Sequence, residues 1–270
     1  MNIKLYIVTY NDYESLNNNL SSIFDSNLSN NNLTVNIINN HSNFRLHNNF
    51  KKRVNVIHNM TRPDWSTGHL SRNWNEAIIN GFVDINNANC HIVAHCQDDT
   101  IFDKTWAQII TEACHKYSFI SYGIGDNFCS YTVDSIRAIG LWDERFCNIG
   151  YQEADYFLRA LIYNKSGSSI NDFFHGRVLN PINDKICIHP PVVSNEFSFN
   201  ASERHLKSLV HHGVSREIFL HKWGCNPENW TQQLIDNPPP ISNIKNFIYY
   251  PFFEKNISNL IDKNYLVPNV

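Results

Sequence analysis

Residues 91–100 of the 270-residue chain read His-Ile-Val-Ala-His-Cys-Gln-Asp-Asp-Thr, a short apolar run that ends in two adjacent aspartates. Its length and β-branched residues predict a buried strand over 91–95. Adjacent carboxylates raise each other's pKa, so Asp98 and Asp99 favour a hard divalent cation such as Mg²⁺ or Mn²⁺ between them. The alternative for this pair is a loop turn, or an N-cap for a helix that begins after Thr100.

The same arrangement, an apolar strand followed by a polar string, occurs three more times in the N-terminal half. The polar strings begin at Tyr10, Asn39 and Asn59. Ligands of α/β sheets bind at the carboxyl ends of the strands, where such strings lie. The sequence therefore predicts an α/β fold with strands over 4–9, 33–38 and 54–58 and helices over 13–24, 69–82 and 104–117.

The second half of the chain is less regular. We expect a strand over 119–124 and helices over 153–163 and 202–223, whereas 130–139 suits a strand or a helix equally. Prolines are frequent after Pro181, which predicts long loops and short elements. We therefore expect a core over 1–180 and a C-terminal extension over 181–270, within one continuous domain.

Composition limits the classes of function. The chain is 42% hydrophobic with a net charge of −3, and it has no basic stripe for nucleic acid. No apolar run is long enough to span a membrane, and the N-terminus lacks a signal-peptide cleavage site. The seven cysteines form no C-x-x-C pair, which disfavours zinc or redox motifs. We expect a soluble, cytoplasmic protein of undetermined oligomeric state.

Three further residues have side chains suited to chemistry. Glu153, at a helix start, could act as a general base, although it and Asp155 could simply complement the helix dipole. Arg72 suits a phosphate, although an ordinary surface arginine is the alternative. His175 follows two phenylalanines and could be a metal ligand at a strand end.

Taken in order, six strings of the chain resemble the family 2 type of glycosyltransferases with the GT-A fold. They cover roughly residues 3–177 and are Val8-Thr9-Tyr10-Asn11, Asn39-Asn40-His41-Ser42, Ser71-Arg72-Asn73, Gln97-Asp98-Asp99, Gly140 to Phe146, and Tyr151 to Arg159. The resemblance implies a mixed central sheet flanked by helices. It also implies an inverting, metal-dependent transfer of a sugar from a nucleotide-diphosphate donor to a hydroxyl of a glycan or other saccharide.

The resemblance also implies roles for individual residues. Glu153 would be the base, Asp99 and His175 would bind Mn²⁺ or Mg²⁺, and Asp98 and Arg72 would lie at the donor diphosphate. UDP is the first choice of nucleotide, with GDP or another possible. The nucleoside would lie against Thr9, Tyr10, Asn11 and Asn39, and the acceptor against Trp142, Asp143 and Glu144.

The sequence departs from the family pattern at three places. Asn39 and Gln97 replace acidic residues, and Gln152-Glu153 replaces a Glu-Asp pair. A catalytically silent sugar-binding or scaffold module of the same fold is therefore one alternative. A sugar nucleotidyltransferase is another, although it would require a glycine-rich N-terminal loop that residues 9–16 lack.

Overall fold

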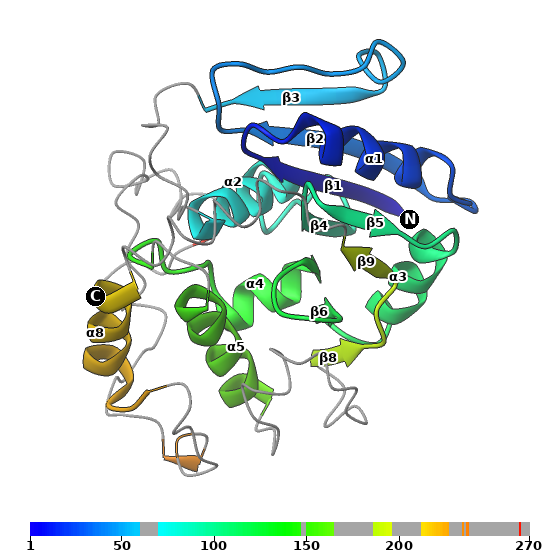
Figure 1. Ribbon diagram of the computed structural model, residues 1–270. Helices are drawn as coiled ribbons and strands as arrows, with labels where there is room; N and C mark the ends of the chain where they lie inside the picture. Colours follow the sequence, from blue (N-terminus) through cyan, green and yellow to red (C-terminus); the bar gives the residue numbers. More distant parts are fainter. Residues whose placement is uncertain are drawn as a thin grey trace.

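A seven-stranded mixed sheet forms the centre of the computed structural model, which describes residues 1–59, 70–146, 150–164, 186–195, 212–226, 234, 236–237 and 265 (Figure 1). The strand order is β3-β2-β1-β4-β7-β6-β8. Strand β7 is antiparallel to both of its neighbours, and the other strand pairs of this sheet are parallel. The strands are β1 Asn2–Thr9, β2 Asn32–Asn39, β3 Val54–His58, β4 Ile92–Gln97, β6 Phe119–Tyr122, β7 Phe128–Tyr131 and β8 Ile186–His189.

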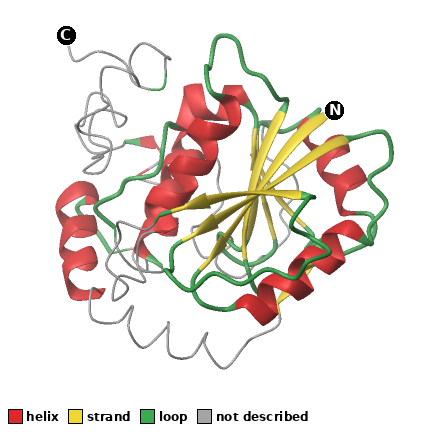
Figure 2. Cartoon of the chain, turned by 90° about the horizontal axis from the view of Figure 1, so that it is seen from above, coloured by secondary structure: helices red, strands yellow, loops and turns green. Residues whose placement is uncertain are grey.

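Helices cover both faces of this sheet, as Figure 2 shows. One face packs against α1 (Tyr13–Phe24) and α3 (Trp106–Cys114). The other packs against α2 (Leu70–Phe82), α4 (Val133–Ile139), α5 (Tyr151–Asn164) and α8 (His212–Trp223). Successive side chains of β1 enter alternate cores, because strand side chains alternate between faces. This explains why β1 is apolar at every position from Leu5 to Val8.

The turn after β1 places α1 against the sheet. Asn11 has a φ of 54°, a left-handed conformation that asparagine tolerates better than most residues. Asp12 then caps α1, because its Oδ1 accepts a hydrogen bond from the Ser15 amide at 3.3 Å. Leu16, Leu20 and Ile23 lie one turn apart on the buried side of the helix.

The observed elements agree with most of the sequence predictions and correct several. Residues 130–139 contain the end of β7 and then α4, so the segment is partly strand and partly helix. The short strands β5 (Thr100–Phe102) and β9 (Val193–Asn195) were not expected, and they pair with each other. Of the helix expected over 202–223, residues 202–211 lie outside the described part.

The boundary expected at residue 180 does not divide the sheet. Strand β8 lies beyond it in sequence but pairs in parallel with β6 and forms one edge of the central sheet. Helix α8 likewise packs in the main core. The C-terminal extension therefore contributes to the same core as the N-terminal region.

Among residues in the described ranges, no helix combines the length and the apolar character needed to cross a membrane.

Gly81 in α2 provides a test of the packing between this helix and β4. A Cβ atom added at Gly81 would overlap the Cγ2 methyl of Val93 and lie 3.1 Å from its Cγ1. We expect Gly81→Ala to lower the free energy of unfolding by about 1–3 kcal/mol, because the extra methyl must be forced into a filled core. Urea unfolding monitored by circular dichroism measures this change.

Gly213→Ala is the matched control, since Gly213 lies in α8 and an added Cβ there would enter open space. Alanine favours the helix, so the control should be as stable as the wild type or more stable by up to about 1 kcal/mol. Equal stability of the two variants would contradict the close packing at Gly81.

Candidate active site

The polar residues that follow the parallel strands lie along one edge of the sheet. Asn40 donates its backbone N–H to the Thr9 carbonyl at 3.1 Å, and Asn59 donates its own to the Asn39 carbonyl at 2.9 Å. Gln97 ends β4 on the other side of β1, in register with Val8. The ends of β1, β2, β3 and β4 are thus neighbours, as the sequence predicted.

The aspartate pair forms the tight turn between β4 and β5. The side-chain amide of Asn19, from α1, donates to the Thr100 carbonyl at 2.6 Å and to the Gln97 carbonyl at 3.4 Å. One buried amide therefore holds both ends of the turn. Asp98 is 0% exposed and Asp99 is 5% exposed, so both carboxylates of the turn are buried.

This turn suits a hard divalent cation in its donor chemistry. Mg²⁺ is usually held by one or two carboxylates together with substrate phosphates. Within the described ranges no three His, Cys, Asp or Glu side chains converge. Buried hydroxyls nearby support a ligand here: among the described residues, Thr9 Oγ1 and Thr100 Oγ1 have no hydrogen-bond partner. His175 lies outside the described residues.

The residues expected at the nucleoside differ in solvent exposure. Tyr10 and Asn11 are at least partly exposed, and the Tyr10 ring packs edge-on against His41 at 5.3 Å. Asn39 is buried, and its amide donates to the His41 carbonyl at 2.6 Å and contacts His58 Nδ1 at 3.1 Å. The Asn39 side chain therefore shapes the loop after β2.

Arg72 lies in the first turn of α2 and is partly exposed. This turn begins next to the end of β3, because Asn59 donates to Glu76 Oε2 at 2.9 Å and to Asn73 Oδ1 at 3.5 Å. The same Asn59 amide donates to Asn40 Oδ1 at 3.2 Å. These hydrogen bonds hold the start of α2, and with it Arg72, beside the ends of β2 and β3, where other candidate residues lie.

Glu153 lies against Asp126, a residue that the sequence analysis did not select. Glu153 Oε1 accepts a hydrogen bond from the Asp126 backbone N–H at 3.4 Å. Burial and the neighbouring Asp126 raise the pKa of Glu153 well above its usual value. Glu153 is thus a buried carboxyl group with high proton affinity.

Asp126 belongs to the same sheet edge as the aspartate pair. It precedes β7, and because β7 is antiparallel to β4, the start of β7 lies beside the end of β4. The side-chain amide of Gln97 contacts Asp126 Oδ1 at 3.5 Å, and the backbone N–H of Gln97 donates to the Asn127 carbonyl at 3.3 Å. Gln97 therefore links the turn at Asp98 with the pair formed by Asp126 and Glu153.

Asp126 could have been suspected from its neighbours in sequence. It follows Gly123 and Gly125, whose φ values of 104° and 57° form the turn before β7. Gly125 is also required by Glu153, because a Cβ there would lie 2.8 Å from Glu153 Oε1. A glycine pair followed by an acidic residue at a strand start was the available signal.

The three residues expected at the acceptor, Trp142, Asp143 and Glu144, are buried among their neighbours. The Trp142 ring stacks on Tyr156 at 4.2 Å and its Nε1–H donates to the Tyr131 hydroxyl at 3.1 Å. Glu144 Oε1 accepts a hydrogen bond from the Asn75 amide at 3.0 Å. Both side chains are buried and make these contacts within the protein.

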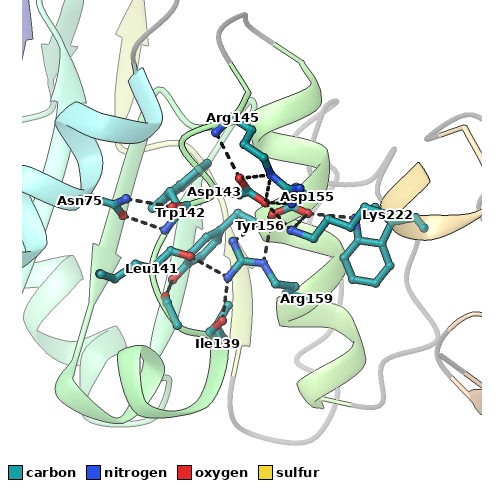
Figure 3. Close-up of polar contacts among 12 residues, drawn as sticks. Asn75, Ile139, Leu141, Trp142, Asp143, Arg145, Asp155, Tyr156, Arg159 and Lys222 are labelled. Atoms are coloured by element: carbon teal, nitrogen blue, oxygen red, sulfur yellow. Dashed lines mark hydrogen bonds and ion pairs between the residues drawn. The ribbon is translucent and has the colours of Figure 1, made fainter. Parts of the chain in front are cut away.

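Asp143 belongs to a buried network of ion pairs between α5 and α8 (Figure 3). Lys222 Nζ lies 2.8 Å from Asp143 Oδ2 and 2.6 Å from Asp155 Oδ1. Arg145 pairs with Asp143 at 2.6 Å, and Arg159 pairs with Asp155 at 3.0 Å. Burial alone would raise the pKa of Asp143, but Lys222 and Arg145 lower it to about 2. The network fixes the fold around the site instead of lining it.

These features together define an α/β fold: a mixed central sheet with helices on both faces and an acidic turn after β4. The predicted α/β class, with a mixed central sheet flanked by helices, is confirmed. No family model matches the sequence, and no curated protein matches it.

Several solved structures resemble the chain at low identity. TarS 1–349 from S. aureus has a TM-score of 0.48 and 9% identity, covering 82% of this chain and 74% of that one. The mannosyltransferase PcManGT from Pyrobaculum calidifontis, in complex with GDP-Man and Mn²⁺, has a TM-score of 0.43 and 11% identity, covering 78% of this chain and 63% of that one. The match to a longer TarS structure from S. aureus, at a TM-score of 0.43 and 11% identity, covers 59% of this chain and 34% of that chain. At these identities the likeness concerns the fold alone.

Lys222 allows a test of the ion-pair network. We expect Lys222→Met to lower the free energy of unfolding by about 3–5 kcal/mol, because the change removes the cation shared by two buried carboxylates. The wild type should lose the contribution of Asp143 as the pH falls from about 4, near the unfolded pKa, towards the folded pKa of about 2. The variant should lose less over this range. Denaturant unfolding at several pH values measures both effects.

Arg216→Ala on the same helix is the control. Arg216 is exposed and lies 3.9 Å from the exposed Glu217, so its loss should change stability by less than about 1 kcal/mol. A Lys222→Met effect as small as this one would show that the buried network does not stabilise the fold.

Proposed function

We propose that this protein is a metal-dependent, inverting glycosyltransferase that moves a sugar from a nucleoside-diphosphate donor to a hydroxyl group of a saccharide. The observation that carries the proposal is the pairing of two acidic groups at one sheet edge. Asp98 and Asp99 form one group, and Asp126 and Glu153 form the other. Gln97 directly precedes Asp98 in sequence, and its side chain contacts Asp126. Sugar transfer requires two such functions, one at the leaving diphosphate and one at the attacking hydroxyl.

The aspartate turn would hold the donor side. Asp98 and Asp99 would bind Mn²⁺ or Mg²⁺, which supplies Lewis-acid stabilisation of the diphosphate charge when bound. Thr9 and Thr100 have buried hydroxyls that can donate to donor oxygens. Arg72 would add positive charge at the start of α2. Tyr10 and Asn11, which follow β1, would lie at the nucleoside, with UDP as the first choice and GDP as the second.

Glu153 would act at the acceptor. Its ionised carboxylate would accept the proton of the acceptor hydroxyl as that oxygen forms a bond to the anomeric carbon. The bond between the anomeric carbon and the diphosphate oxygen breaks, and its electron pair leaves with the nucleoside diphosphate. Attack from the face opposite the leaving group inverts the configuration. A buried carboxyl group of raised pKa is a stronger base than an exposed one, which suits this role.

Asp99→Ala tests the donor side. We expect transfer or hydrolysis of the nucleotide sugar to fall by about 100-fold or more, since the stabilisation of leaving-group charge supplies several kcal/mol. A panel of UDP- and GDP-sugars with Mn²⁺, assayed with and without EDTA, measures this loss. Calorimetry with UDP and Mn²⁺ should show a parallel loss of binding.

Asp134→Ala removes an exposed carboxylate from α4 and should leave both measurements unchanged. Activity that persists in both EDTA and Asp99→Ala would exclude the metal role. Nucleotide-sugar binding without any turnover across the panel would favour a silent sugar-binding module instead.

A further inference from the structure

Asn19 is a polar residue in the middle of the buried side of α1. It is 0% exposed and shares that side of the helix with Leu16, Leu20 and Ile23, which pack in the core. Asparagine is a poor helix former, and a buried amide is costly unless it is hydrogen-bonded. The local preferences of a helix are therefore overridden at this position, which happens most often at functional sites.

The turn that contains Asp98 and Asp99 joins two separate sheets. Strand β4 pairs with β1 and β7 in the seven-stranded sheet, whereas β5 pairs with β9 in a two-stranded sheet. A hairpin turn is fixed by the ladder hydrogen bonds between the two strands that it connects. Because β4 and β5 pair with other strands in the described part of the chain, the shape of this turn depends on contacts from outside it.

The side chain of Asn19 provides such a contact. Its Nδ2 lies 2.6 Å from the carbonyl oxygen of Thr100, which begins β5, and 3.4 Å from that of Gln97, which ends β4. It also lies 3.7 Å from Cys96 Sγ. Carbonyl oxygens only accept hydrogen bonds, so the group that faces them must be the NH₂ of the amide. One side chain of α1 thus connects the two residues that flank the aspartates.

Other contacts hold α1 against the chain that follows the turn. The Phe102 N–H donates to Ser22 Oγ at 3.0 Å, and the Asn27 N–H donates to the Lys104 carbonyl at 2.8 Å. These hydrogen bonds lie beyond the turn and do not involve the side chain of Asn19. They can therefore keep the helix in place when Asn19 is replaced, so the effect of its amide on the turn can be measured separately.

We propose that Asn19 is a positioning residue of the donor site: by holding the carbonyls of Gln97 and Thr100, its amide sets the placement of Asp98 and Asp99 for a divalent cation and the donor diphosphate. This role rests on the proposed function and deepens it. Divalent cations such as Mg²⁺ require their ligands in a narrow geometry, so a turn of variable shape binds them more weakly. Groups that orient metal ligands typically change the affinity by about 10–100-fold.

Hydrogen exchange followed by NMR tests the turn in the metal-free protein. We expect Asn19→Ala to speed exchange at the backbone amides of Asp98, Asp99 and Thr100 by about tenfold or more relative to the amides of β1. The reason is that buried carbonyls left without a donor favour local opening of the turn. Ser22→Ala is the matched control on the same helix, and it should speed exchange at Phe102 instead.

Two exchange results would overturn the role of the amide. One is exchange at the turn that stays at the wild-type rate in Asn19→Ala, and the other is equal acceleration at the turn in Ser22→Ala. Should Asn19→Ala fail to fold, Asn19→Ser provides the same comparison, because its shorter side chain cannot reach both carbonyls. None of these measurements requires a ligand.

Electron paramagnetic resonance of free Mn²⁺ tests the donor site itself. Each variant is titrated with Mn²⁺ in the presence of UDP, at a temperature well below its unfolding transition. We expect the Kd of Mn²⁺ to rise by about 10–100-fold in Asn19→Ala and to stay at the wild-type value in Ser22→Ala. A purely structural role for Asn19 would lower the unfolding temperature and leave this Kd unchanged, which would overturn the proposal.

Asp99→Ala separates this proposal from the proposed function. If Asp99→Ala loses Mn²⁺ binding while Asn19→Ala keeps the wild-type Kd, the positioning role is overturned and the donor site stands. If the wild type binds no Mn²⁺ with either UDP or GDP, the metal-dependent function and the role of Asn19 toward the cation are overturned together.

Discussion

The hydrogen-bond ladder on the two sides of β4 positions the whole candidate site. Its parallel pairing with β1 places Gln97 beside Val8, and its antiparallel pairing with β7 places Cys96 beside Phe128. The first pairing brings the end of β4 to the polar ends of β1 and β2. The second brings the residues before β7, Asp126 among them, to that same edge. A single change of strand direction thus gathers acidic residues that are far apart in sequence.

The molecule stabilises its buried carboxylates in two different ways. Around Asp143 and Asp155, lysine and arginine side chains neutralise the charge, and the cluster holds α5 against α8. Around Asp126, neutral indole and amide groups donate hydrogen bonds, and no described ion pair involves it. The first arrangement has little capacity to exchange a proton near neutral pH, because its cations hold the carboxylates ionised. The second lies beside Glu153, a buried carboxyl group whose pKa is raised.

The departures from the family pattern acquire a physical reason in this setting. Gln97 and Gln152 stand where the sequence resemblance would place acidic residues, and both side chains donate to Asp126. A carboxylate at either position would repel Asp126 instead of stabilising it. The two glutamines therefore act as hydrogen-bond donors to this buried acidic residue. They do not by themselves indicate a loss of activity.

Much of the fold was determined by local sequence, because periodicity and turn residues act over a few positions. The run before Asp98, the left-handed Asn11 and the Asp12 cap specify strands and α1 without reference to distant parts. Strand β8, the partner of β6, could not be assigned from sequence, because nothing local specifies its pairing partner. The roles of Asp126, Trp142 and Asp143 likewise depended on burial and on contacts between distant residues. An acidic side chain is the same in sequence whether a lysine or a second carboxyl group lies beside it, and only the packed structure decides which.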